Sequence, residues 1–351
     1  MSTPISPQDD PHSEEIDPPT TNPPSFQAEV SGNLDPKDVS TAPSEDKAAA
    51  VLPELTEADL APPPLQRKTV LPVALFVATC ASTFWVGAAD FQPVWAMSNS
   101  RLARQVVEEN WLQGLIYMGA VLAILLTHEM GHFLFTIRYK IPASYPIFIP
   151  IPFSPIGTMG AVIGMDGLRA DRKQMFDLGL AGPLAGLVVA IPVLWLGILR
   201  FNADLPRGGF EFYNPMLVTM LFEYLRPDIV APQTISVNQL NPLLMAGWVG
   251  LLITGLNMLP ISQLDGGHVT YALFGKRAHT LARAFVMVAI AYIIIQEIYI
   301  WTLMLVLVIM MGTDHPPTSD DTVELGPVRE WVGLASLLIP ILCFPPQGIA
   351  G

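Results

Sequence analysis

Charged residues are scarce in this chain of 351 residues. Asp, Glu, Lys and Arg make up 14% of it, whereas hydrophobic residues make up 51%. Residues 1–65 alone hold 13 acidic side chains and two lysines, while the remainder holds 18 acidic and 16 basic ones, so the net charge of −13 comes mainly from the tail. Because nucleic-acid binding requires a concentration of basic side chains, we expect no nucleic-acid partner.

Cysteine is nearly absent as well. Cys80 and Cys343 are the two cysteines, and each lies inside an apolar run. Two distant cysteines provide neither a disulfide framework nor the ligand spacing of a cysteine metal site. We expect both to be packing residues in apolar surroundings.

The tail, residues 1–65, contains 13 prolines and a single aromatic residue, Phe26. Such a segment cannot bury enough apolar surface to offset the entropy lost on ordering, so we predict that it is disordered. It lacks the apolar core of a signal peptide and the Arg-rich, acid-poor composition of an organelle transit peptide. Residues 66–351 are predicted to form the membrane-embedded domain.

Long uncharged apolar runs are what the chain has in abundance, and its mean hydropathy is +0.44. Runs of about 20 apolar residues are long enough to cross a bilayer as helices. We predict an all-α polytopic membrane protein with six to seven transmembrane helices. The expected spans are 70–89, 111–135, 176–199, 242–264, 284–311 and 331–344. Gln296 and Glu297 interrupt the fifth run, which favours a hairpin of two short helices there.

Basic residues near the ends of the spans indicate their orientation, because such residues accumulate on the cytoplasmic side. With the N-terminus inside, eleven basic residues flank the spans on the inner side and five on the outer side. We therefore expect a cytoplasmic N-terminus and an outer loop at 200–241, in which the amphipathic stretch 216–225 lies along the surface. The absence of a transit signature favours a bacterial plasma membrane.

His128 and His132 lie four positions apart in the second expected span, within the string His128-Glu129-Met130-Gly131-His132. On a helix they project from the same face, at a spacing that allows two imidazoles to bind one Zn²⁺. Glu129 is placed to act as a general base. A charged group at the centre of a membrane helix costs about 2.5–3.5 kcal/mol, so its presence indicates a function.

Asp265 is the candidate for a third ligand. The second and fourth expected spans run in the same direction, so Asp265, just after the fourth, comes out at the level of His128 and His132. Two imidazoles and one carboxylate make an open site of the catalytic kind. Pro260 and Asn257 could open the helix so that Asp265 reaches inward. The alternatives are that Asp265 is a helix-end acid terminated by two glycines, and that Asn257 is an interhelical hydrogen-bonding group.

The two motifs together, His-Glu-x-x-His in one span and Asn-x-x-Pro-x-x-x-x-Asp-Gly in a later one, resemble the site-2 protease family of intramembrane zinc metalloproteases. The glycine-containing runs 157–163 and 176–186 and the sequence 264–268 also match. The resemblance is closest to a bacterial and plastid branch without a PDZ domain. It implies one Zn²⁺ on His128, His132 and Asp265, Glu129 as catalytic acid and base, and a single-span membrane protein in the lipid bilayer as substrate.

The segment 143–165 is apolar but contains four prolines, so it cannot be a regular spanning helix. Irregular backbone at membrane depth persists only when it is buried in protein or lines a wet cavity. We predict a re-entrant element with a short strand at 160–165. The edge formed by Gly160, Ala161, Val162 and Ile163 could hold an unwound substrate by strand addition; the alternative is an interfacial loop packed on the bundle.

Three further functional hypotheses are compatible with the sequence. A membrane zinc protease of another lineage would take its third ligand from Glu297. A zinc-stabilised scaffold would not be catalytic, and a transporter would need further ionisable residues along a pathway, for which only Glu297 qualifies. His268 is interpreted as a helix-end histidine, and the alternative is a hydrogen-bonding partner of a metal ligand. His279 and His315 are interpreted as residues outside any ligand cluster, and the sequence does not indicate an oligomeric state.

Overall fold

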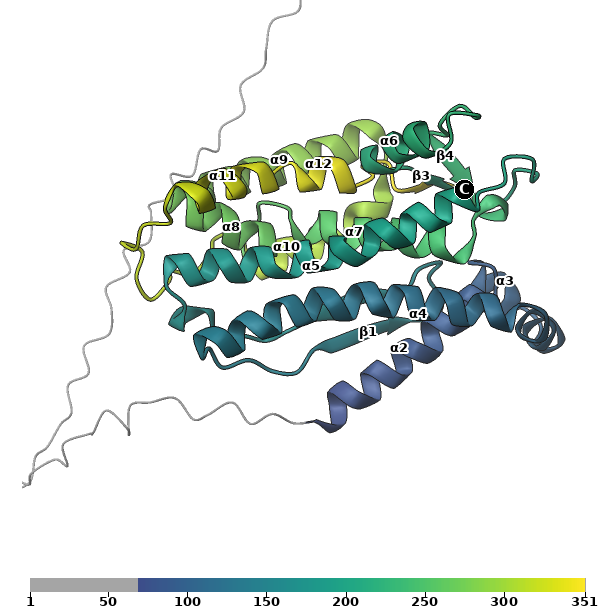
Figure 1. Cartoon of the computed structure of the whole chain (residues 1–351), viewed down its shortest axis with the longest axis horizontal. Helices are drawn as coiled ribbons and strands as arrows, with labels where there is room; N and C mark the ends of the chain where they lie inside the picture. Colours follow the sequence, from purple (N-terminus) through teal and green to yellow (C-terminus); the bar gives the residue numbers. More distant parts are fainter. Residues whose placement is uncertain (1–68, 351) are drawn as a thin grey trace, which may run out of the picture. The chain divides into compact units, whose positions relative to one another are not determined.

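The computed structural model describes residues 69–350, so the predicted disorder of residues 1–65 lies outside the described residues. This part of the chain is mostly helical (Figure 1). The helices are α2 (Val70–Ala88), α3 (Pro93–Met97), α4 (Ser100–Tyr139), α5 (Arg172–Leu199), α6 (Met216–Leu225), α7 (Pro242–Asn257), α8 (Asp265–Phe274), α9 (Arg277–Gln296), α10 (Thr302–Met311), α11 (Pro327–Ser336) and α12 (Ile339–Cys343). The strands are β1 (Ile147–Ile151), β2 (Gly157–Val162), β3 (Glu211–Tyr213), β4 (Thr234–Ser236) and β5 (Ile349–Ala350).

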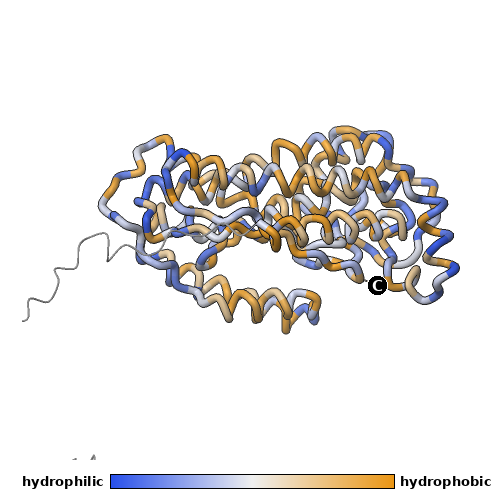
Figure 2. The backbone as a smooth tube through the Cα atoms, turned by 90° about the horizontal axis from the view of Figure 1, so that it is seen from below, coloured by the Kyte–Doolittle hydropathy of each residue, from blue (hydrophilic) through white to orange (hydrophobic). Residues whose placement is uncertain are grey.

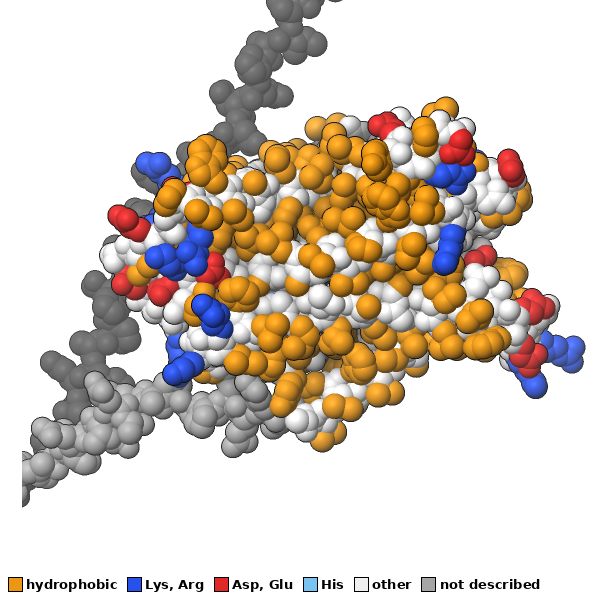
Figure 3. All heavy atoms as spheres, viewed as in Figure 1, with side chains coloured by type: hydrophobic (Ala, Val, Ile, Leu, Met, Phe, Trp, Pro, Cys, Tyr) orange, Lys and Arg blue, Asp and Glu red, His pale blue; other side chains and the backbone are white. Residues whose placement is uncertain are grey.

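Four of the described helices, α2, α4, α5 and α9, are long and apolar enough to cross a membrane. Hydrophobic residues dominate the middle of the molecule, and hydrophilic residues gather towards its two ends (Figure 2). On the face shown in Figure 3, hydrophobic side chains cover the centre, while Lys, Arg, Asp and Glu gather towards the two ends. This distribution fits a lipid-facing belt between two aqueous surfaces.

The buried core lies where α4, α5 and α7 pack on one another. Residues 244–252 of α7 are all buried, so this helix is enclosed by protein on every side. Helix α5 begins with a capping box, in which Asp171 accepts the N–H of Gln174 and the Gln174 side chain accepts the N–H of Asp171. These two bonds satisfy backbone donors that the first turn of a helix leaves unpaired.

Helix α4 is longer than the predicted span 111–135 at both ends, and it is kinked at Asn110, where φ is −115° and ψ is 16°. The charged turns before Asn110 continue the helix beyond the apolar run. The prediction that one span covers 242–264 is wrong, because α7 ends at Asn257 and α8 begins at Asp265. Hydropathy missed this break because the connecting residues are themselves mostly apolar.

The predicted break in 284–311 is confirmed, since α9 ends at Gln296 and Glu297 adopts a left-handed conformation before the 3₁₀ turn Tyr299–Trp301 (η4) and α10. The predicted span 331–344 is wrong as a single helix. It is divided between α11 and α12, which are ten and five residues long.

The segment 143–165 forms an antiparallel hairpin of β1 and β2, closed at its base by a bridge between Ala143 and Met165. The second strand ends at Val162, so the predicted strand at 160–165 is placed too far along the chain. Polar side chains of the flanking helices hold the end of the hairpin: Ser82 of α2 donates to the Gly157 carbonyl, and Tyr117 of α4 donates to the Ile156 carbonyl at 2.6 Å.

A second sheet, which the sequence did not predict, has the strand order β4-β3-β5. Its central strand β3 pairs antiparallel with β4 from the same loop and with β5 near the C-terminal end of the chain. The amphipathic stretch 216–225 is confirmed as helix α6. The predicted loop 200–241 is therefore an ordered cap, in which the Trp248 indole of α7 donates to the Tyr213 carbonyl at 2.9 Å.

Candidate metal centre

His128 and His132 project from the same face of α4 towards α5 and α8. Their Nε2 atoms lie 3.2 Å apart, and the two residues are 2% and 4% exposed. The apolar sequence around them continues the helix without interruption from Trp111 to Tyr139, which holds both imidazoles one turn apart.

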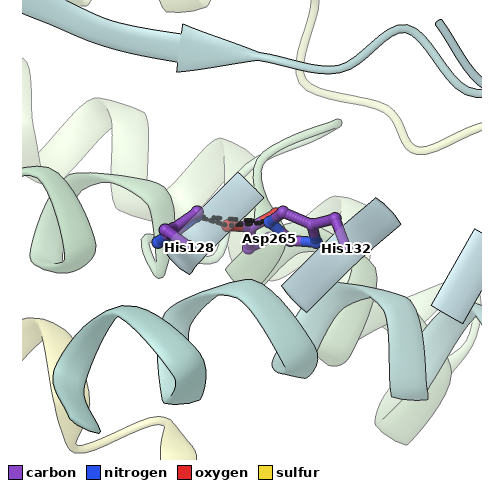
Figure 4. Close-up of side chains that lie close together, drawn as sticks. All are labelled: His128, His132 and Asp265. Carbon is purple, nitrogen blue, oxygen red and sulfur yellow. Dashed lines mark hydrogen bonds and ion pairs between the residues drawn. The ribbon is translucent and has the colours of Figure 1, made fainter. Parts of the chain in front are cut away.

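Asp265 is the first residue of α8, and the connection 258–264 brings it back to the level of the two histidines. Its Oδ2 lies 3.3 Å from His128 Nε2 and 3.4 Å from His132 Nε2 (Figure 4). The glycines at 266 and 267 lie in the first turn of α8, so the alternative in which they terminate a helix is wrong.

Zinc fits the three converging atoms. Two ligand atoms bound tetrahedrally at zinc distances of about 2.0–2.1 Å lie roughly 3.3 Å from each other. The three separations observed here are 3.2, 3.3 and 3.4 Å. His132 Nδ1 donates to the Leu178 carbonyl at 2.9 Å, so a neutral imidazole presents a lone pair at Nε2. A lone pair facing a buried carboxylate is unfavourable unless a proton or a metal ion lies between them.

Helix α5 shapes the other side of the centre. A Cβ atom at Gly182 would overlap His132 Nε2, and one at Gly186 would lie 3.1 Å from His128 Nδ1. These two glycines therefore make room for both imidazoles. The sequence did not reveal the Leu178 carbonyl, which orients His132, because any residue offers a carbonyl and only the fold selects this one.

Glu129 and Asn257 lie in the same region. Glu129 neighbours His128 on α4 and is 4% exposed. Asn257, the last residue of α7, places its side-chain nitrogen 3.3 Å from His128 Nε2. The structure thus brings Asn257 to the site and not only to a helix-helix contact.

The predicted substrate-holding residues lie on and just after β2. Gly160 faces α7, since a Cβ there would lie 3.8 Å from Ile253, one helical turn before Asn257. Val162 is 54% exposed, and Ile163 follows the last residue of the strand. Gly160 is therefore next to α7, and Ala161 and Val162 complete the strand.

His268 and His315 are hydrogen-bonded to each other, which the sequence did not predict. His315 Nδ1 donates to the Pro316 carbonyl, so its Nε2 accepts from His268 Nδ1 at 2.7 Å. Tyr271 stacks on the His315 ring with centroids 4.4 Å apart. These contacts attach the segment 312–326 to α8, the helix that begins with Asp265. Burial lowers the pKa of His315, which lies outside the membrane helices, and this is consistent with a neutral, hydrogen-bonded ring.

Glu297 does not join the centre. It is exposed at the C-terminal end of α9, whereas the group of side chains positioned for a metal consists of His128, His132 and Asp265. Helix α9 is 20 residues long, and a helix of that length spans about 30 Å. The alternative with Glu297 as third ligand is therefore not supported.

A His-Glu-x-x-His helix completed by a carboxylate from a second helix, inside an apolar helical bundle, defines a membrane-embedded metalloprotein of the zinc peptidase type. The sequence model of Peptidase family M50 matches residues 116–299. The chain belongs to this family, which is the site-2 protease family that the two motifs indicated. The chain is thus a zinc protein, and four of its described helices are long and apolar enough to cross a membrane.

Plant proteins are among the curated relatives of the chain. The chain is 37% identical over 163 residues to "Probable zinc metalloprotease EGY1, chloroplastic" of Oryza sativa subsp. japonica, covering 45% of this chain and 28% of the relative. It is 31% identical over 233 residues to the protein of the same name of Arabidopsis thaliana, covering 64% and 42%. "Probable zinc metalloprotease EGY2, chloroplastic" of Arabidopsis thaliana is 27% identical over 241 residues, covering 67% and 42%. The chain thus spans less than half the length of these relatives. No solved structure matches it.

Proposed function

We propose that the protein is an intramembrane zinc endopeptidase that cleaves transmembrane segments of single-span membrane proteins. The observation that carries this proposal is the convergence of two imidazole nitrogens and one carboxylate oxygen within 3.2–3.4 Å, beside a buried glutamate in an apolar bundle. Membership of family M50 supports the same reaction class.

In this mechanism His128, His132 and Asp265 would hold Zn²⁺, which would supply Lewis-acid chemistry that makes water a stronger nucleophile. The Glu129 carboxylate accepts a proton from the attacking water and passes it to the nitrogen of the leaving amine. The side-chain amide of Asn257, next to His128, is placed to donate to an oxygen of the substrate.

Replacing Glu129 with Gln tests the catalytic role. Because the glutamine keeps the size of the side chain but cannot accept the proton, we expect zinc to be retained and cleavage of a reconstituted membrane substrate to fall by at least 10²-fold. Glu297→Gln is the matched control, since it removes a carboxylate outside the centre and should leave cleavage unchanged. Wild-type activity in Glu129→Gln would contradict the proposal.

We further propose that the edge at 160–163 holds the substrate as an extended strand. A transmembrane helix keeps its peptide carbonyls in its own hydrogen bonds, so cleavage requires local unwinding, and an exposed strand edge offers replacement partners. A substrate with Gly or Asn near the cleaved bond should therefore be cut faster than one with Leu and Ala there. Equal rates for the two substrates would count against strand addition.

For the topology we propose six or seven spans, a cytoplasmic N-terminus and a bacterial plasma membrane. The shorter apolar helices α7, α10 and the pair α11 and α12 would supply the spans beyond the four long ones. The excess of basic residues on one side supports the orientation. Single cysteines are introduced at exposed Leu205, in the proposed outer loop, and at Lys276, at the other end. In intact cells an impermeant reagent should label Leu205→Cys and not Lys276→Cys, and labelling of Lys276→Cys alone would indicate the opposite topology. Cell fractionation would identify the membrane that contains the protein.

A further inference from the structure

Side chains from two other helices meet at Asp177, near the start of α5. Arg329 of α11 donates from Nε to Oδ1 at 2.8 Å and from Nη2 to Oδ2 at 2.9 Å. Tyr139, the last residue of α4, donates its hydroxyl to Oδ2 at 2.5 Å. The Asp177 side chain is 13% exposed, so its charge depends on these donors and not on bulk water.

A second hydrogen bond joins α4 to α5 nearer the metal centre. Leu178, the next residue after Asp177, accepts the hydrogen bond from His132 Nδ1 at 2.9 Å. Tyr139 follows His132 by seven positions, two helical turns, and therefore lies on the same face of α4. His132–Leu178 and Tyr139–Asp177 are thus two successive links along one α4–α5 seam, and sliding or rotating either helix would disturb both.

We propose that Arg329 is a positioning residue for His132, acting through Asp177 and Tyr139. A bidentate guanidinium fixes the plane of a carboxylate as well as neutralising it. With its plane fixed, Asp177 holds Tyr139 and the register of α4 against α5, and this register directs the Leu178 carbonyl at His132. Outer partners of this kind set the orientation of a metal-binding imidazole.

Arg329 lies outside residues 116–299, the part matched by the family model. Helix α11 thus contributes a charge to the orientation of a ligand 197 positions earlier in the chain. This inference deepens the proposed zinc function and names a group that neither zinc motif contains.

The test compares full-length Arg329→Gln and Arg329→Lys with Arg226→Gln. Arg226 forms a similar ion pair with Asp228, with Nε and Nη2 at 2.9 and 2.8 Å, but on the outer loop, so it controls for loss of an arginine-carboxylate pair. Zinc affinity is measured by chelator competition, and Co²⁺ absorption reports the geometry of the ligands. Cleavage gives kcat and KM separately.

We expect Arg329→Gln to weaken zinc binding by about 10–100-fold, as for the loss of other outer partners. The Co²⁺ spectrum should change and kcat should fall with KM nearly unchanged, whereas Arg329→Lys should recover part of each loss and Arg226→Gln should match wild type. Tyr139→Phe added to Arg329→Gln should cost less than the two single effects combined, because both act through Asp177.

Wild-type zinc affinity and Co²⁺ spectrum in Arg329→Gln would overturn the positioning role. So would equal zinc loss in Arg226→Gln, which would indicate a general effect on stability. Zinc affinity and the Co²⁺ spectrum are readable without any substrate. A wild-type protein that binds zinc but cleaves nothing would therefore refute the proposed function alone.

Discussion

At the scale of single residues, Gly182 is the position where α5 leaves least room for a side chain. A methyl group there would overlap the His132 imidazole, which is enclosed between α4 and α5. Overfilling a packed interior costs about 1–3 kcal/mol, and here the displaced group is a proposed ligand.

Gly182→Ala should therefore reduce both zinc affinity and cleavage, each by 10-fold or more. Gly119→Ala is the control on α4, since its added Cβ would have no neighbour within 4 Å. That control should bind zinc as wild type does, with a small gain in helix stability of roughly 0.5–1 kcal/mol. Chelator competition measures zinc affinity, and thermal unfolding measures stability. Normal zinc binding in Gly182→Ala would contradict the close approach of α5 to His132.

The third ligand can be tested at the same scale. Asp265→Ala removes an oxygen 3.3–3.4 Å from both imidazole nitrogens, whereas Glu297→Ala removes an exposed carboxylate at the end of α9. We expect the first change to weaken zinc by more than the ~10–100-fold typical of losing an outer partner, and the second to leave zinc unchanged. Metal analysis gives the zinc content of the purified variants. Loss of zinc in Glu297→Ala together with normal zinc in Asp265→Ala would instead support Glu297 as the third ligand.

At the scale of elements, the segment 312–326 is anchored to α8 through His315. His315 meets His268, Tyr271 and His279, whose Nε2 lies 3.2 Å from the His315 carbonyl. Asp321 faces the same cluster, where it accepts from the Tyr271 hydroxyl at 2.9 Å. Burial lowers the pKa of His315, so the attached ring resists a proton that a released one would bind near pH 6.5.

Because the attached form binds fewer protons, its stability is complete above about pH 6.5 and declines as the pH falls through the lowered pKa of His315. We expect an added protease to cut this chain within 312–326 faster at low pH. His315→Gln should show a weaker pH dependence. The Arg283–Asp314 ion pair keeps its charge in this range, since Arg283 lowers the pKa of Asp314. Cleavage that is independent of pH in the wild type would contradict this anchoring.

Elements differ in how far the sequence could predict them. The spacing of His128 and His132 specifies a shared helix face, and Gln296 with Glu297 marks a real break. The end of α7 at Asn257 was not visible to hydropathy, because most of the residues between it and Asp265 are apolar. The β3–β5 pairing joins residues 137 or more positions apart, and such pairing depends on tertiary contacts that no local pattern contains.

At the scale of the whole molecule, the apolar belt predicts where a charge is tolerated. Val188, near the middle of α5, is 72% exposed, and Val230 in the loop 200–241 is 93% exposed. Val188→Lys should lower the yield of inserted protein, because a charge at the centre of a membrane helix costs about 2.5–3.5 kcal/mol. Val230→Lys should be neutral. Carbonate extraction of membranes measures the inserted fraction, and equal yields would argue against α5 facing lipid.

The kink of α4 at Asn110 is a reference point for the depth of the metal centre. His128 follows Asn110 by eighteen residues, which is about 27 Å along a helix, whereas the hydrocarbon layer is about 30 Å thick. With Asn110 at one membrane surface, the proposed cleavage would take place near the opposite surface and divide the transmembrane segment of the substrate unequally. One product would keep almost the whole apolar segment and stay in the bilayer, while the other would carry only a few apolar residues and be free to leave it.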